Sequence, residues 1–265
     1  MGKRFPLQIW LITVNPKALQ DMGNGENCPR REVPGNVNLA PLRCYGNTVR
    51  SFRNCLTKNM CLKKREKELI IGFILGDCSV ERNGANCRLR FDHSRLQLDS
   101  CRWKHRILSP HCGKFTEYDS WDKRTKKYYA KCRFYTWTRP YFNVYRELFY
   151  PAGEKQIPES IGDLLTSEWT LAAWFLDDGS RRTDCAALRL HTNSYRKEEC
   201  SLLSEVLEKN FSISSTLHRA RPRNKIGGEE RDWILHIGGS GAERLDFLIR
   251  PIIKAQFPQF LYKCL

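Results

Sequence analysis

Two short apolar segments of this sequence each end in a carboxylate. Residues 171–179 read Leu-Ala-Ala-Trp-Phe-Leu-Asp-Asp-Gly, and residues 70–78 read Ile-Ile-Gly-Phe-Ile-Leu-Gly-Asp-Cys. Aligned without a gap, they set Asp77 against Asp178 and Gly72 against Ala173. A carboxylate is disfavoured at a helix C-terminus, where the carbonyls are already partly negative. Two such helices packed side by side would gather both acids at one end, where carboxylate oxygens suit hard divalent cations.

Local signals predict that residues 171–179 end a short buried helix. Thr166 is the expected N-cap, Glu168 falls in the first turn, and Gly179 suits the position after the last turn. Asp-Gly after a helix is also ordinary turn chemistry, which is the alternative interpretation of this segment alone. The second acid-ended segment favours a site instead.

The elements around these segments are predicted to occur in the same order twice. The first half should contain a helix at 63–76, a strand at 82–92, a helix at 95–108, a hairpin of 114–121 with 128–138, and a helix at 140–149. The second should contain the Asp178 helix, a strand at 186–192, a helix at 197–210, a hairpin of 214–221 with 231–237, and a helical segment at 240–257 with a break at Pro251. This order indicates a tandem duplication of α+β type. The predicted divisions are a basic irregular extension over 1–62, a first half over 63–157 and a second half over 158–265.

A lysine follows the last helix of each half. Lys155 comes shortly after Pro151, and Lys263 comes shortly after Pro258. A lysine beside a phosphate could stabilise the negative charge of a transition state. A lysine taken singly is more often a surface charge, so the matched placement carries this interpretation.

The chain is strongly basic, which favours a polyanionic partner. Lys and Arg outnumber Asp and Glu by 45 to 29, for a formal net charge of +16. Basic residues alternate with apolar ones on strands of both halves, a pattern that fits β-ribbons in a DNA major groove. Solvated strand faces on a merely basic protein are the alternative. The candidate DNA-binding residues are Arg82, Arg88, Arg90, Lys114, Lys126, Lys127, Lys131, Arg133, Tyr135, Arg189, His191, Asn193, His218, Arg219, Arg221 and Arg223.

Neither a membrane span nor a disulfide framework is indicated. No apolar run approaches the ~18 residues of a transmembrane helix. The twelve cysteines are scattered without a Cys-x2-Cys pair, so most are expected to be buried thiols. A zinc site is a weaker alternative, and its candidate ligands are Cys28, Cys44, Cys55 and Cys61, or Cys101, His111 and Cys112.

The paired segments resemble the two motifs of single-chain LAGLIDADG homing endonucleases, close to the yeast mitochondrial intron-encoded type. The resemblance covers roughly residues 63–265. It rests on the two segments, with Asp77 and Asp178 at the acidic eighth position, on the Lys155-x-Ile157-Pro158 loop, and on the terminal Pro258-Gln259-x-x-Tyr262-Lys263. The first segment departs from the motif by ending in Cys78, and Gly76 is opposed by Asp177.

The resemblance implies a pseudo-twofold αββαββα repeat whose antiparallel sheets form a DNA-binding saddle. It implies a monomer encoded in an organellar intron that cleaves both strands of a long asymmetric DNA target and leaves short 3′ overhangs. Two or more Mg²⁺ ions would be shared by Asp77 and Asp178, with Gly76 and Asp177 as further metal-site residues and Lys155 and Lys263 as catalytic lysines. The alternative on the same scaffold is a maturase that binds intron RNA, or a non-cleaving regulator.

Overall fold

The computed structural model describes residues 61–220 and 231–265, which belong to one compact unit. The extension predicted over 1–62 therefore lies outside the described residues except for its last two, and Arg221 and Arg223 lie outside them as well. Within the described ranges, no helix is long and apolar enough to cross a membrane.

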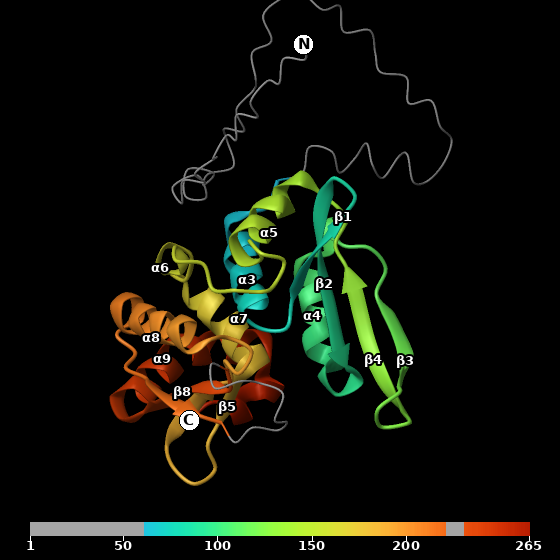
Figure 1. The fold of residues 1–265 in the computed structure, drawn as a ribbon. Helices are drawn as coiled ribbons and strands as arrows, with labels where there is room; N and C mark the ends of the chain where they lie inside the picture. The colour runs from blue at the N-terminus through green and yellow to red at the C-terminus, as the bar shows by residue number, and fades with distance from the viewer. Residues whose placement is uncertain (1–60, 221–230) are drawn as a thin grey trace, which may run out of the picture. The chain divides into compact units, whose positions relative to one another are not determined.

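The predicted order of helix, strand region, helix, hairpin and helix is confirmed in both halves, except that two strands stand in each half where one was predicted (Figure 1). The first half consists of α3 (Lys64–Leu75), β1 (Ser79–Asn83), β2 (Asn86–Ser94), α4 (Leu98–Ile107), β3 (Thr116–Asp122), β4 (Lys127–Tyr135) and α5 (Asn143–Phe149). The second consists of α7 (Glu168–Asp178), β5 (Gly179–Arg181), β6 (Ala187–Leu190), α8 (Lys197–Phe211), β7 (Thr216–Arg219), β8 (Trp233–Gly238) and α9 (Gly239–Gln256), with α6 (Ile161–Leu164) between the halves. The antiparallel sheets have the matching orders β1-β2-β4-β3 and β5-β6-β8-β7. This equivalence confirms the mixed α and β fold with an internal repeat.

Three local predictions are wrong. The single strand predicted over 82–92 is two strands, because the chain turns at Gly84 with φ of +69°. The N-cap of α7 is Ser167, whose hydroxyl accepts a hydrogen bond from the Trp169 amide at 3.2 Å, and not Thr166. α9 continues through Pro251 without a break, because apolar residues on both sides of the proline are buried and hold the two parts in one helix.

Alternation along the strands separates a core face from an open face in each sheet. In β2, Leu89 and Phe91 are buried under α4, while Arg88 and Arg90 lie on the opposite face. Phe91 stacks on Phe134 of β4 with ring centroids 4.4 Å apart, which ties two central strands together on the core side. Helices therefore cover one face of the sheet, and the other remains available for a partner.

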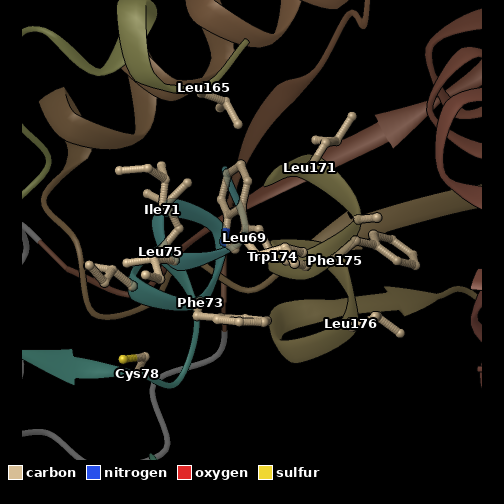
Figure 2. Close-up of a cluster of buried hydrophobic side chains, with 14 of the residues drawn as sticks. Leu69, Ile71, Phe73, Leu75, Cys78, Leu165, Leu171, Trp174, Phe175 and Leu176 are labelled. Carbon is tan, nitrogen blue, oxygen red and sulfur yellow. The ribbon is translucent and has the colours of Figure 1, made fainter. Parts of the chain in front are cut away.

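The centre of the molecule is the contact between α3 and α7, whose apolar side chains form one buried cluster (Figure 2). A Cβ atom at Gly72 would lie 2.3 Å from the Thr170 carbonyl oxygen and 2.7 Å from the Ala173 Cβ. One turn later, a Cβ at Gly76 would lie 2.6 Å from the Asp177 Cβ. The helices therefore run in the same direction at very close approach, and both acid-bearing ends meet at one end of the pair.

Candidate active site

Each acid lies at the end of its central helix, just before the first strand of its sheet. Asp77 follows the C-cap residue Gly76, and its side chain is 42% exposed. Asp178 is the last residue of α7 and is half-buried. The end of α3 is also fixed from the other half, because the Tyr195 hydroxyl donates to the Leu75 carbonyl at 2.8 Å. The acids predicted to lie together therefore come from matched positions on a rigid support.

The surroundings of Asp178 disfavour the ionised form of its carboxyl group. Burial, followed by the nearby carboxylates of Asp177 and Asp77, raises the pKa of Asp178 to about 7, and Lys155 opposes this effect. Crowded carboxylates that ionise reluctantly are stabilised when a cation is added. The electrostatics of the helix ends therefore fit a cation-binding site.

Lys155 of the first half and Lys263 of the second half both extend to the acid-bearing ends of the central helices. Lys155 Nζ donates to the Gly76 carbonyl and Lys263 Nζ to the Leu176 carbonyl, each at 2.7 Å. Burial lowers the pKa of both lysines, while the neighbouring carboxylates oppose that shift. The structure thus brings both predicted lysines to the carbonyls that end the two helices; their roles in catalysis stay a prediction.

Two buried residues beside the acids, Lys104 and His93, were not predicted from the sequence. Lys104 of α4 contacts Asp177, with 2.5 Å between Nζ and Oδ1. His93, near the end of β2, has its Nδ1 3.6 Å from the Asp77 Oδ2. Burial and the nearby Lys104 ammonium lower the pKa of His93 to about 4, so its ring is neutral at physiological pH. The alternation of β2 continues from Leu89 and Phe91 to His93, which could have marked the histidine as buried, whereas Lys104 stands among basic residues that give no such signal.

The donor set suits a hard cation better than zinc. It offers the carboxylate oxygens of Asp77 and Asp178 and the Gly76 carbonyl oxygen, which also accepts a hydrogen bond from Lys155, and oxygen ligands are preferred by Mg²⁺ over softer metals. No group of three or more His, Cys, Asp or Glu side chains in the described ranges could hold a metal by itself. A metal here would therefore need backbone, water or phosphate oxygens. The zinc alternative gains no support from Cys101, His111 and Cys112, and Cys28, Cys44 and Cys55 lie outside the described residues.

The open face of the first sheet carries four of the predicted basic residues, Arg88, Arg90, Lys131 and Arg133. Lys131, Arg133 and Tyr135 alternate with buried residues along β4, and Arg133 lies over the Tyr118 ring at 4.3 Å. Lys114 is exposed before β3, and Lys126 and Lys127 lie at the β3–β4 turn. Arg82 does not share this face: it pairs with buried Cys87, so side-chain alternation directs it away from Arg88 and Arg90.

The second sheet has a basic hollow of about 710 Å³ on its surface. The predicted residues that line it are Arg189, His191, Asn193, His218 and Arg219. His218 and His236 lie with their rings 4.6 Å apart within the hollow. Both sheets therefore present basic and aromatic groups, although their detailed compositions differ.

Known proteins share this sequence pattern and fold. The LAGLIDADG DNA endonuclease family matches residues 67–244. The chain is 28% identical over 166 residues to the cytochrome b mRNA maturase bI2 of Debaryomyces hansenii, covering 61% of this chain and 62% of that protein. It is 28% identical over 171 residues to the DNA endonuclease I-ChuI of Chlamydomonas applanata, covering 60% of this chain and 78% of that enzyme.

A solved structure has the same fold. The homing endonuclease I-WcaI bound to its DNA recognition sequence matches with a TM-score of 0.69 and 23% identity, over 83% of this chain and 94% of that one. The chain spans slightly less than two thirds of the maturase, whereas it spans nearly all of the solved endonuclease. Since the family match extends over both acid-bearing helices and both sheets, the chain belongs to the LAGLIDADG DNA endonuclease family.

Proposed function

We propose that this protein makes a staggered double-strand break in a long, asymmetric DNA target in a reaction that requires a divalent metal ion. The observation that carries the proposal is the meeting of two acid-ended helices from equivalent halves, each end joined by a lysine. With two equivalent halves, one acid can serve the cleavage of each DNA strand. Because their sheet faces carry different residues, they should recognise different half-sites.

Asp77 and Asp178 are the proposed carboxylate ligands of Mg²⁺, assisted by the backbone carbonyls of Gly76 and Asp177. Bound Mg²⁺ supplies Lewis-acid polarisation of the phosphate and lowers the pKa of water. Two or more ions shared by the acids would relieve the repulsion that raises the pKa of Asp178. The Asp177 side chain is engaged by Lys104, so we assign it a supporting role.

Lys155 and Lys263 are proposed to stabilise the negative charge that develops on the cleaved phosphate. Their ammonium groups are held at the acid-bearing helix ends by hydrogen bonds to backbone carbonyls. Their partial burial strengthens electrostatic interactions relative to those in bulk water. They would thereby contribute positive charge next to the metal site without acting as ligands.

Duplex DNA is the proposed partner of the two open sheet faces. Arginine and lysine give phosphate affinity, while arginine, asparagine and histidine can contact base edges. On the first sheet Glu81 and Asp92 form ion pairs with Arg90, and Arg88 lies over the Tyr135 ring at 4.2 Å. These contacts hold the arginines in defined positions before DNA arrives, which lowers the entropy lost on binding.

Intron RNA binding is the second candidate function. It is favoured by the similarity to a protein named as a maturase and by the basic sequence of residues 1–62. The presence of both acids and both lysines favours cleavage as the main activity. The family resemblance also supports an organellar location and a monomer as further proposals.

The decisive experiment incubates the purified protein with Mg²⁺ and a plasmid carrying the intronless allele of its host gene. We expect linear DNA with short 3′ overhangs, and none in the presence of a chelator. Asp77→Asn and Asp178→Asn should each abolish double-strand cleavage while leaving DNA affinity nearly unchanged. Double-strand cleavage retained by both variants would refute the assignment of these acids.

A further inference from the structure

A buried ion pair lies directly behind the proposed metal site. The Lys104 side chain is 0% exposed and that of Asp177 is 2% exposed, with 2.5 Å between Nζ and Oδ1. The two residues come from different halves, on α4 and α7. A buried pair of this kind is weak evidence of stabilisation, because the desolvation of both charges offsets their attraction. Its position therefore calls for a functional explanation.

The surroundings of Lys104 leave it few polar partners. Its Nζ lies 5.3 Å from the centroid of the Phe73 ring and 5.9 Å from that of Phe91. Besides Asp177, its polar contact is His93 Nε2 at 3.3 Å. The ammonium thus lies near two aromatic rings and contacts two side chains, Asp177 and His93. Each of these side chains in turn contacts Asp77.

The first connection runs through Asp177 to the backbone of Asp77. The second carboxylate oxygen of Asp177, Oδ2, accepts a long hydrogen bond of 3.4 Å from the Asp77 amide. The same oxygen would lie only 2.7 Å from a Cβ atom at Gly76. Asp177 therefore covers the Gly76–Asp77 peptide, and its position depends on Lys104, which holds the other oxygen.

The second connection runs through His93 to the side chain of Asp77. An ammonium can only donate, so His93 Nε2 must accept from Lys104, which leaves the ring proton on Nδ1. Nδ1 lies 3.1 Å from the Gln97 Oε1 and 3.6 Å from the Asp77 Oδ2. Lys104 thereby fixes the tautomer whose Nδ1–H is donated to Gln97, and this holds the edge of the ring against the Asp77 carboxylate.

We propose that Lys104 is a positioning residue that orients Asp77 through Asp177 and His93. The inference rests on the proposed endonuclease function and adds a supporting residue to it. Both connections converge on Asp77, so loss of Lys104 should first affect the metal held by this acid. The DNA strand that Asp77 serves should then be cut more slowly than the other.

Two variants test this role and one serves as a control. Lys104→Met removes the ammonium, and Lys104→Met/Asp177→Asn removes both buried charges so that neither is left uncompensated. Glu66→Gln breaks another buried pair, in which Glu66 Oε2 lies 3.1 Å from His111 Nε2 at the N-terminal end of α3. That end is about 16 Å from Asp77 along the helix, at 1.5 Å per residue.

The measurements are Mn²⁺ affinity by electron paramagnetic resonance and the ratio of nicked to linear plasmid during cleavage. We expect both Lys104 variants to bind Mn²⁺ about tenfold or more weakly, as loss of a group that orients a metal ligand typically does. Both should accumulate nicked DNA. Glu66→Gln should lower the melting temperature and leave both readouts as in the wild type.

If Lys104→Met alone fails to fold, the double variant Lys104→Met/Asp177→Asn tests the positioning role of Lys104. A folded double variant with wild-type Mn²⁺ affinity and a wild-type ratio of nicked to linear DNA would overturn the proposal. If the wild type binds Mn²⁺ but cuts no DNA, the endonuclease function fails. The Mn²⁺ affinities of the variants still test Lys104 in that event.

Discussion

Replacing Asp178 with Asn should stabilise the metal-free protein while abolishing cleavage. Burial and two neighbouring carboxylates raise the pKa of Asp178 from 3.8 to about 7. An acid whose pKa is higher in the folded than in the unfolded state lowers the free energy of unfolding when it ionises. This loss is small below pH 3.8, grows between pH 3.8 and 7, and is complete above about pH 7.

The magnitude follows from the difference between the two pKa values. At 1.36 kcal/mol per pH unit, it corresponds to ~4 kcal/mol of unfolding free energy at pH 8. The Asn side chain keeps the approximate shape of Asp without its charge, so Asp178→Asn should recover a large part of this energy. With ~2–4 °C per kcal/mol for a domain of this size, the melting temperature should rise by roughly 5–10 °C.

The assay is thermal unfolding with a chelator present, at pH 4 and at pH 8. The gain should be several degrees at pH 8 and should nearly vanish at pH 4, where the carboxyl group is protonated in the folded state. Asp77→Asn is the matched control, because Asp77 is 42% exposed and its replacement should change stability much less. An equal gain at both pH values, or no gain at pH 8, would refute the electrostatic reasoning.

Three further predictions concern the lysines, the helix contact and the sheet face. Lys155→Ala and Lys263→Ala should each slow single-turnover cleavage about tenfold or more, as loss of ~1.4 kcal/mol of transition-state stabilisation would; unchanged rates would refute their role in catalysis. Gly72→Ala should lower the free energy of unfolding in urea by roughly 3 kcal/mol, because its Cβ would overlap the Thr170 carbonyl, whereas Gly162→Ala has room and should change it little. Arg133→Ala should weaken DNA binding and reduce the salt dependence of its affinity by about one ion, as measured by fluorescence anisotropy; an unchanged slope would exclude a phosphate contact.

The helix pair was predictable because its signal is local and occurs twice. Six apolar residues before an acid define a buried helix end, and the ungapped alignment of the two segments placed Gly72 against Ala173, as the structure confirms. The division of residues 79–94 into two strands was missed, although Gly84, the first of the two turn residues, is the kind of residue that such a tight hairpin requires. Arg82 was assigned to the wrong face for the same reason, since an unrecognised turn changes the alternation of side chains.

Other features depend on tertiary contacts that no local pattern contains. Pro251 should end a helix by local rules, but burial on both sides of it outweighs the lost hydrogen bond. Lys104 lies in a helix with several basic residues, where a lysine is expected to face solvent. Only the packing of α4 and α7 in three dimensions reveals that this lysine is the partner of an aspartate in the other half.

The departure of the two segments from symmetry has a physical explanation in this packing. At the position before each acid, one helix has Gly76 and the other has Asp177, and the glycine is required because the aspartate occupies the space of its side chain. An aspartate at that buried position in turn requires a cation, which Lys104 supplies. The three residues therefore constrain one another: Gly76→Asp would create a clash with Asp177, and Asp177→Gly would leave the Lys104 ammonium buried without a counter-charge. With this set in place, the two halves are not interchangeable at the acids, even though their folds are alike.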